Sequence, residues 1–591
     1  MIGASVAGDV TVRTSSNGRV HRPLRTGARL ISGAMAAMWM LFVPVAVRGQ
    51  TRYETLRDLS ATFWRWRAVT QPSTSDDIPR IERPVGWVPD WSPAAVRNRQ
   101  VRLVRLEARW EAIDTTGWSI PHQVDYRLMG SALARARWEL VVNPAWRRDP
   151  FFYIDQTLGS VFELLLQPPP FDPARSTDII RRLDRIPATL AAARENLDRP
   201  VRPFARLARD EAAAAPERLR TVAERLGPHL SGPDAGRLNS TTDAAGRALA
   251  AFADWLDDGL DSMPEETAVG GGPYRFFLHR VALLPFEPEE LVKMARQEWE
   301  RAVAFETLEL HRNRGLDTLG YFPDQAAQIG RERQDEDAIR RFLETRDLLT
   351  VPDWLHHYTN RPVPDYLVPL AHLGVDDDLT SPTRLDQDAV SYIWPPSPAL
   401  GYFARSTARD PRPIIVHEGV PGHYFQLALS WAQDNPIRRH YYDSGANEGI
   451  GFYAEEMMLQ AGLWDQSPRS REIIYNFMRL RALRVEVDVR LATGEFTIDE
   501  AADYLERTVP MDRATAREEA AFFASTPGQA ISYQIGKLQI VHLVAEARRR
   551  RGDRFSLRHL HDFLWRNGNV PIALVSWEYL ESGEDGDPGN R

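Results

Sequence analysis

The segment 414–430 constrains the local structure more than any other stretch, because it places two histidines and a glutamate between apolar runs. His417, Glu418 and His423 are the residue types of a catalytic zinc site, which needs neutral imidazoles as ligands and a carboxylate to deprotonate water. In the helical motif His-Glu-x-x-His, the ligands at i and i+4 share one face. Here the spacing is i and i+6, which on an ideal helix points the two side chains about 240° apart. Because Pro421 and Gly422 can bend or bulge the backbone, we expect His423 to swing back beside His417.

Glu448 can supply a third ligand to this site. It comes 25 residues after His423, which leaves room for a helix, a turn and the start of a returning helix. Two histidines and a glutamate would bind zinc and leave the fourth position for water. Glu455, two helical turns further on, is expected to orient a ligating imidazole. The plain alternatives are that both histidines are ordinary core or loop residues, and that Glu448 is an acid favoured by a helix N-terminus.

Composition narrows the possible ligands and partners. The chain has no cysteine, so any metal must be held by nitrogen and oxygen atoms. The net charge is −8; the first 49 residues carry +5, which leaves −13 on the rest of the chain. A body that is acidic and lacks a basic block argues against nucleic acid as the partner.

The N-terminal residues 1–49 resemble an export signal. Arginines precede an apolar run at residues 30–47, and small residues at Ala46 and Gly49 offer a cleavage region before Gln50. We therefore expect an exported protein, periplasmic or extracellular. The alternative is an uncleaved N-terminal anchor, because the apolar run is almost long enough to span a bilayer, and only then would the protein contact a membrane.

The rest of the chain predicts a mainly α fold with few short strands. Apolar residues recur with helical spacing at residues 101–113 and 177–194, and further helices are predicted at 287–301 and 335–349. Residues 212–216 and 231–236 are predicted to be interhelix loops, and the proline-rich residues 351–400 to be ordered loop or short strands. A glycine tract at residues 270–272 suggests an N-terminal helical region, residues 50–269, and a C-terminal catalytic region, residues 270–591.

Several polar residues downstream could serve either function or structure. An oxyanion formed at the metal needs further hydrogen-bond donors, which Gln529, Tyr533 or Lys537 could supply. Lys537 could also bind a substrate carboxylate, although an exposed lysine is an equal alternative. Arg484 and Asp488 stand four residues apart on a predicted helix, so they could contact substrate or simply pair with each other. Three other histidines are not expected to bind metal, because no acid stands at a suitable spacing: His356, His357 and His440.

Four blocks of sequence together resemble a known family. They are His417-Glu-Gly-Val-Pro-Gly-His423, Glu448-Gly-x-x-x-Tyr453-Ala-Glu455, Arg484-x-x-x-Asp488 and Pro527-Gly-Gln529-Ala-x-Ser-Tyr533-x-Ile-Gly536. In this order they resemble a bacterial group of helical HExxPGH zinc metallopeptidases, long catalogued as a domain of unknown function. More distantly, the chain is similar to the helical gluzincins related to angiotensin-converting enzyme.

The resemblance implies a large multi-helix fold with a deep central cleft and one Zn²⁺ per chain. His417, His423 and Glu448 would hold the zinc, Glu418 would act as general base, and Tyr533 would stabilise the oxyanion. The chain departs from the family pattern at three positions, Tyr424, Ile450 and Ala492. Tyr424 and Ala492 stand where histidines are common, so they suggest changed surroundings of the metal or a changed substrate contact.

We therefore expect an exported zinc-dependent peptidase that hydrolyses peptide bonds of short peptides or peptide-like substrates. One alternative is a zinc-dependent hydrolase of a non-peptide amide or ester. Another is a non-catalytic envelope binding protein with the same fold. A serine hydrolase or nucleotide-binding enzyme is disfavoured, because Gly-x-Ser-x-Gly, Walker and dinucleotide glycine patterns are absent. No oligomeric state is predicted.

Overall fold

The computed structural model describes residues 34–74, 81–509 and 511–581, with residues 34–51 described as backbone only. Residues Arg52–Arg591 form one compact unit, and Met1–Thr51 are grouped apart from it. The signal or anchor predicted at residues 1–49 lies outside the residues whose side chains are described. Among the described residues, no helix is both long enough and apolar enough to cross a bilayer.

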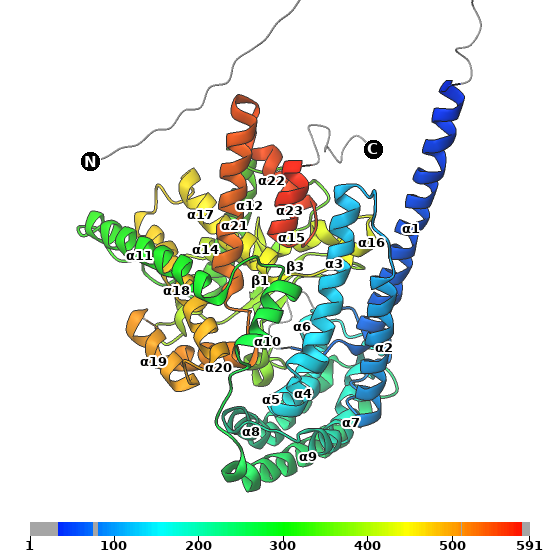
Figure 1. Cartoon of the computed structure of the whole chain (residues 1–591). Coiled ribbons are helices and arrows are strands. Elements are labelled where there is room, and N and C mark those ends of the chain that lie inside the picture. The colour runs from blue at the N-terminus through cyan, green and yellow to red at the C-terminus, as the bar shows by residue number, and fades with distance from the viewer. Residues whose placement is uncertain (1–33, 75–80, 510, 582–591) are drawn as a thin grey trace, which may run out of the picture. The chain divides into compact units, whose positions relative to one another are not determined.

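The compact unit is built mainly from α-helices, as predicted (Figure 1). The helices of the first half are α1 (Ala34–Thr70), α2 (Pro93–Glu111), α3 (Ile120–Arg137), α4 (Ala145–Arg148), α5 (Phe151–Ile154), α6 (Ser160–Leu166), α7 (Pro173–Asn196), α8 (Arg202–Leu226), α9 (Leu238–Gly259) and α10 (Gly271–Phe276). Those of the second half are α11 (Pro288–Arg312), α12 (Gln325–Thr345), α13 (Tyr402–Thr407), α14 (Arg412–Ile414), α15 (His423–Trp431), α16 (Pro436–His440), α17 (Ser444–Ala461), α18 (Pro468–Thr493), α19 (Ile498–Thr508), α20 (Arg513–Ser525), α21 (Ile531–Arg551), α22 (Leu557–Arg566) and α23 (Ile572–Glu581).

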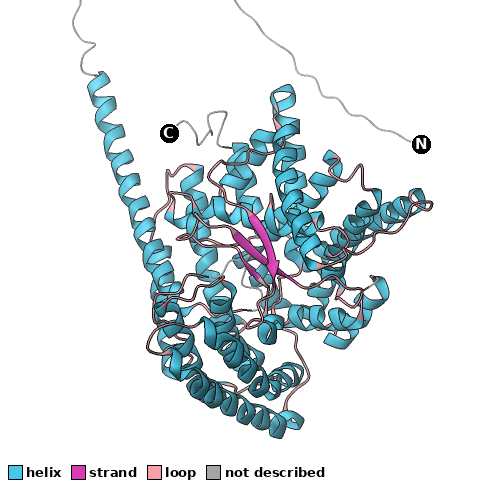
Figure 2. Ribbon diagram, turned by 180° about the vertical axis from the view of Figure 1, so that it is seen from behind, coloured by secondary structure: helices cyan, strands magenta, loops and turns pink. Residues whose placement is uncertain are grey.

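The strands form one small sheet, which Figure 2 shows enclosed by helices. Its order is β1–β3–β2, with β1 (Tyr358–Pro362), β2 (Asp377–Asp378) and β3 (Ala389–Ile393). β1 runs parallel to β3, and β2 runs antiparallel to it. The short strands predicted within residues 351–400 are therefore confirmed.

The helices that carry the candidate site begin and end at residues suited to those positions. α17 starts after Asp443, whose carboxylate accepts a hydrogen bond from the Ala446 amide at 2.9 Å. It ends at Gly462, which has a φ of +94°, and α18 ends at Gly494, with a φ of +85°. Glycine adopts this left-handed conformation without a Cβ penalty, so both helices stop where the chain must turn.

Most of the predicted helices are confirmed, but two expectations need correction. α12 begins ten residues before the predicted residue 335, because Asp324 caps it by accepting a hydrogen bond from the Ala327 amide at 2.8 Å. The loop predicted at residues 212–216 is wrong, since these residues lie inside α8. The alanines before Pro216 favour helix, and Gly246 of α9 lets that helix pack closely against the proline.

The main apolar cluster draws side chains from across the chain, from Leu56 to Tyr579. It therefore includes residues on both sides of Gly270, and the division predicted there stays a prediction. A second cluster joins α18, α19 and α20, and a third joins α10, α18 and α21. These clusters pack α17, α18 and α21 around the segment that contains the paired histidines.

Candidate metal centre

The backbone between the two histidines is broken rather than gently bent. A π-helical turn, η8 (Ile415–Gly419), carries His417, and Val420 after it is extended, with φ −123° and ψ 119°. A new helix, α15, then begins at His423. A Cβ atom on Gly422 would lie 1.7 Å from the His417 carbonyl oxygen, so only glycine fits there. The Trp565 indole of α22 donates to the Pro421 carbonyl at 2.6 Å and anchors the segment.

This break brings the two imidazoles together with Glu448. Nε2 of His417 lies 3.3 Å from Oε2 of Glu448, and Nε2 of His423 lies 3.2 Å from the same oxygen. The two imidazole rings are 4.6 Å apart between centroids. All three side chains are buried, so their polar atoms face one another rather than solvent.

Glycines make this close approach possible. A Cβ on Gly451 would lie 3.0 Å from Cε1 of both His417 and His423, so the glycine leaves room for the two rings. A Cβ on Gly449 would lie 2.7 Å from Cα of Gly536, which is where α17 and α21 meet. The glycines of these sequence blocks thus set the distance between the helices that carry Glu448 and Tyr533.

The three side chains fit a zinc ion. A tetrahedral zinc with bonds of about 2.0–2.1 Å separates its ligand atoms by about 3.3 Å, close to the two observed distances. Burial and Arg481 lower the pKa of His417, but hydrogen bonds to Glu448 and Glu455 raise it to about 9. Burial raises the pKa of Glu448, and the two histidines outweigh it and hold that pKa well below its usual range. The cluster therefore favours a positive charge at its centre.

Glu418 presents a carboxylate to the same centre. Its Oε2 lies 3.7 Å from Nε2 of His423 and forms no hydrogen bond within the described part of the chain, although it is buried. His417, Glu418 and His423 all place a possible ligand atom within 4.8 Å of one another. A buried carboxylate oxygen without a donor is an acceptor available to water or substrate.

Glu455 and Arg481 support His417 from behind. Nδ1 of His417 lies 2.7 Å from Oε1 of Glu455, the position expected for a carboxylate that orients a ligating imidazole. Arg481 of α18 donates to Glu455 at 2.8 Å and is itself buried. Arg481 could not be identified from the sequence, because its partner lies 26 residues away and no local spacing links the two residues.

Tyr533 lies over the site beside Arg484. The planes of the Tyr533 and His417 rings meet at 13°, and the ring centroids are 6.1 Å apart. The Arg484 guanidinium lies 4.8 Å from the centroid of the tyrosine ring. Arg484 and Asp488 do not pair with each other, contrary to the i, i+4 alternative. Arg484 instead donates to Glu519 of α20 at 2.7 Å, because the buried guanidinium faces α20 rather than the next turn of α18.

Asp488 and Gln529 fix the loop that precedes α21. The Asp488 carboxylate accepts hydrogen bonds from the backbone amides of Gly528 and Ala530 at 2.9 and 2.8 Å. Burial raises the pKa of Asp488 to about 7. The Gln529 side chain accepts a hydrogen bond from the Ser444 hydroxyl at 2.9 Å, which ties the loop to the start of α17. These two residues hold the α21 N-terminus, and with it Tyr533, in place.

Tyr424 and Lys537 lie away from the imidazole pair. Tyr424 is buried, and its ring centroid is 6.4 Å from that of Tyr358 on β1. The alternative that Lys537 is an exposed surface lysine is wrong. The side chain is buried, and its ammonium pairs with Glu298 and Glu456 at 3.2 and 2.8 Å. Of the other positions that depart from the family pattern, Ile450 and Ala492 are buried core residues.

A second cluster of possible ligands involves His357. Its Nδ1 lies 2.8 Å from Glu336 and 3.9 Å from Asp337, both of which belong to α12. The expectation that no acid partners this histidine is wrong, because the acids come from a helix about 20 residues earlier in the chain. Arg340 also pairs with Glu336, at 2.6 Å, so the cluster is held together without a metal.

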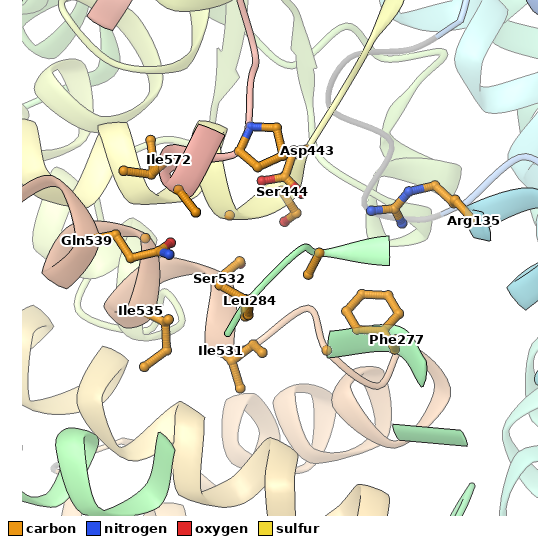
Figure 3. A pocket seen from close by; sticks show the side chains of 16 residues that line it. Arg135, Phe277, Leu284, Asp443, Ser444, Ile531, Ser532, Ile535, Gln539 and Ile572 are labelled. Atoms are coloured by element: carbon orange, nitrogen blue, oxygen red, sulfur yellow. The ribbon is translucent and has the colours of Figure 1, made fainter. Parts of the chain in front are cut away.

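Two cavities border α21, and neither is lined by the imidazole pair. The smaller, of about 20 Å³, has room for a water molecule and lies between the start of α17 and the loop before α21 (Figure 3). Asp443, Ser444 and Ile531 line it, and Arg135 and Phe277 close one side. The larger cavity lies among α11, α17, α18 and α21. The deep central cleft stays a prediction.

Fold and site together define a large, mainly α protein with a buried cluster of two histidines and a glutamate. Residues 83–578 match the family described as bacterial protein of unknown function (DUF885), so the chain belongs to that family. No curated protein matches the chain significantly.

Two solved structures have a similar fold. A candidate lipoprotein of unknown function from Shewanella oneidensis superposes with a TM-score of 0.67 at 17% identity, over 90% of this chain and 99% of its own. A candidate lipoprotein from Colwellia psychrerythraea gives a TM-score of 0.70 at 16% identity, over 89% of this chain and 98% of its own. At such identities the likeness shows the fold alone.

Proposed function

We propose that this protein is an exported zinc-dependent peptidase that hydrolyses short peptides. The observation that carries the proposal is the convergence of His417, His423 and Glu448, with nitrogen-to-oxygen distances of 3.3 and 3.2 Å. Two neutral imidazoles and one carboxylate are the protein ligands of a catalytic zinc site, which keeps a further position open. A zinc ion held there would supply Lewis acidity, which activates water and polarises a carbonyl group.

Glu418 is the general base in this proposal. Its free, buried Oε2 can accept a proton from the attacking water, and the same carboxyl group can then pass that proton to the leaving amine. An amide needs this second transfer, because an amine leaves poorly without a proton. The single carboxylate thus serves both steps, and this favours peptides and other amides as substrates.

Tyr533 is the proposed donor to the oxyanion. Its ring lies parallel to that of His417, and the buried Arg484 beside it adds positive charge on the same side. A fixed donor and a nearby cation stabilise negative charge that develops on the carbonyl oxygen. The ion pair of Arg484 with Glu519 keeps the guanidinium in place beside the Tyr533 ring.

Two observations support the export of the protein. The arginine-rich start and the apolar run at residues 30–47 have the order of a secretory signal or an N-terminal anchor. The two structural neighbours are described as candidate lipoproteins, which supports a location of this chain at the cell envelope. Cleavage or retention of the segment decides between a soluble envelope protein and an anchored one.

The test compares wild type with Glu418→Gln, using metal analysis, digestion of a peptide library and hydrolysis of a set of esters. Both proteins are expected to hold one zinc per chain, and the variant to lose hydrolysis by at least about 100-fold. Glu289→Gln, at an exposed glutamate of α11, is the control and keeps full activity. If wild type cleaves esters but no peptides, the non-peptide hydrolase is the better assignment. If it holds zinc and cleaves neither, the binding-protein alternative replaces the proposal.

A further inference from the structure

The larger cavity has a volume of about 380 Å³ and lies among α11, α17, α18 and α21. It faces away from the metal centre, since Glu455 contacts His417 whereas the next residue, Glu456, lines the cavity. Successive residues of a helix point about 100° apart, so α17 separates the two sites. The cavity is large enough for a small organic ligand.

Four charged side chains form a closed ring on the cavity wall. Lys537 pairs with Glu298 at 3.2 Å and with Glu456 at 2.8 Å. Arg301 pairs with the same two glutamates, at 3.2 and 2.8 Å. Positive and negative groups alternate around the ring, which therefore has no net charge. A ligand with a large net charge of either sign would gain little from it.

The ring leaves both donors and an acceptor unused. Its contacts to Arg301 run through Nη2 alone, which leaves Nε and Nη1 without a partner in the described residues. The Lys537 ammonium has three N–H groups and uses two. On Glu298, Arg301, Lys537 and Gln534 all donate to Oε2, so Oε1 is free among these contacts. The unused groups are therefore N–H donors on two cations, Arg301 and Lys537, and one acceptor oxygen, Oε1 of Glu298.

A buried lysine at position 537, in a chain that otherwise uses almost only arginine, also suggests a ligand. The chain has 73 basic residues, and all except Lys293 and Lys537 are arginine. Lys537 is only 1% exposed, and its ammonium lies 4.4 Å above the Phe452 ring. Taking an ammonium out of water is costly unless its N–H groups are paired, and the two glutamates accept from only two of the three.

We propose that this cavity binds a free α-amino acid in its zwitterionic form. The ligand carboxylate would accept hydrogen bonds from Lys537 and Arg301, and its ammonium group would donate to Oε1 of Glu298. The lining also contains apolar side chains, Phe305 and Met478 among them, so a large apolar side chain such as that of leucine or phenylalanine fits best. Binding there is independent of whether the metal centre hydrolyses peptides.

The experiment is calorimetric titration of the full-length purified protein with four probes: L-leucine, L-phenylalanine, N-acetyl-L-leucine and L-leucinamide. The free amino acids are expected to bind at least about tenfold more tightly than either blocked derivative, because each derivative lacks one of the two charges. The same titration of His423→Ala excludes binding at the metal centre. Binding retained in that variant assigns the ligand to the cavity even if the protein has no peptidase activity.

Two variants change the cavity itself. Lys537→Met removes one cation and is expected to weaken leucine binding at least about tenfold, whereas Lys293→Met, at the exposed lysine of α11, leaves it unchanged. Met478→Trp keeps all four charges and fills part of the cavity, so it reports on the cavity if Lys537→Met fails to fold. The proposal is overturned if wild type binds no free amino acid. It is also overturned if leucine binds equally well to the folded Met478→Trp protein.

Discussion

Replacing Gly422 by alanine tests the backbone geometry on which the metal centre depends. The added Cβ would lie 1.7 Å from the His417 carbonyl oxygen and 2.5 Å from that of Val416. Contacts under 3.0 Å are not tolerated, so the two backbone segments of the turn must separate by more than about 1 Å. Both sides of the contact are buried backbone, which cannot rotate away as a side chain could.

The cost of this substitution can be estimated from that displacement. Overpacking of a rigid core costs about 1–3 kcal/mol and more where backbone must move, so Gly422→Ala is expected to destabilise the protein by about 3 kcal/mol or more. A zinc site tolerates ligand shifts of only about 0.2 Å, and His417 and His423 flank the clash. Zinc affinity is therefore expected to fall by at least about 100-fold.

The assay combines denaturant unfolding, followed by circular dichroism, with zinc competition against a chromophoric chelator. Gly330→Ala is the matched control, because that glycine lies on an exposed face of α12, where an added Cβ would meet no atom within 4 Å. It is expected to stabilise the protein by about 0.5–1 kcal/mol and to leave zinc affinity unchanged. A Gly422→Ala protein with wild-type stability and zinc affinity would refute the reasoning.

Three further predictions concern other buried residues. Glu455→Gln is expected to weaken zinc binding about 10–100-fold. A variant that binds zinc as tightly as wild type would show that Glu455 does not support His417 as a ligand. Gly449→Ala would press α17 and α21 apart from a contact of 2.7 Å and should lower the unfolding midpoint, whereas an unchanged melting curve would show that the helices can separate freely. Burial lowers the pKa of His561 to about 4, so the unfolded chain binds more protons between that value and the ordinary 6.5, and stability falls as pH falls through this window. The difference in unfolding free energy between wild type and His561→Gln should therefore shrink by about 3 kcal/mol from pH 7 to pH 4. A difference that does not change with pH would contradict the lowered pKa of His561.

The sequence was most informative where the relevant chemistry is local. Proline and glycine between His417 and His423 implied that the helix could not stay regular, and the structure brings the two rings together. The form of the break was not foreseeable. Nothing in the sequence indicated the close backbone approach at Gly422, where a Cβ atom would lie 1.7 Å from the His417 carbonyl oxygen.

Long-range partners account for most of what was missed. Arg484 pairs with Glu519 across helices rather than with Asp488 one turn away, and Lys537 is enclosed by Glu298, 239 residues earlier. Helical spacing predicts which residues of one helix share a face, but it carries no information about the helix packed against that face. For the same reason the alanine-rich residues 212–216 read as a loop, because the helix that accommodates Pro216 is α9.

The most direct test of the central claim is anomalous diffraction from crystals of the zinc-loaded protein, measured on both sides of the zinc absorption edge. We predict a single strong peak about 2.0–2.2 Å from Nε2 of His417, Nε2 of His423 and a carboxylate oxygen of Glu448. No peak at that position, or a peak held only by the Glu336 and His357 cluster, would contradict this prediction.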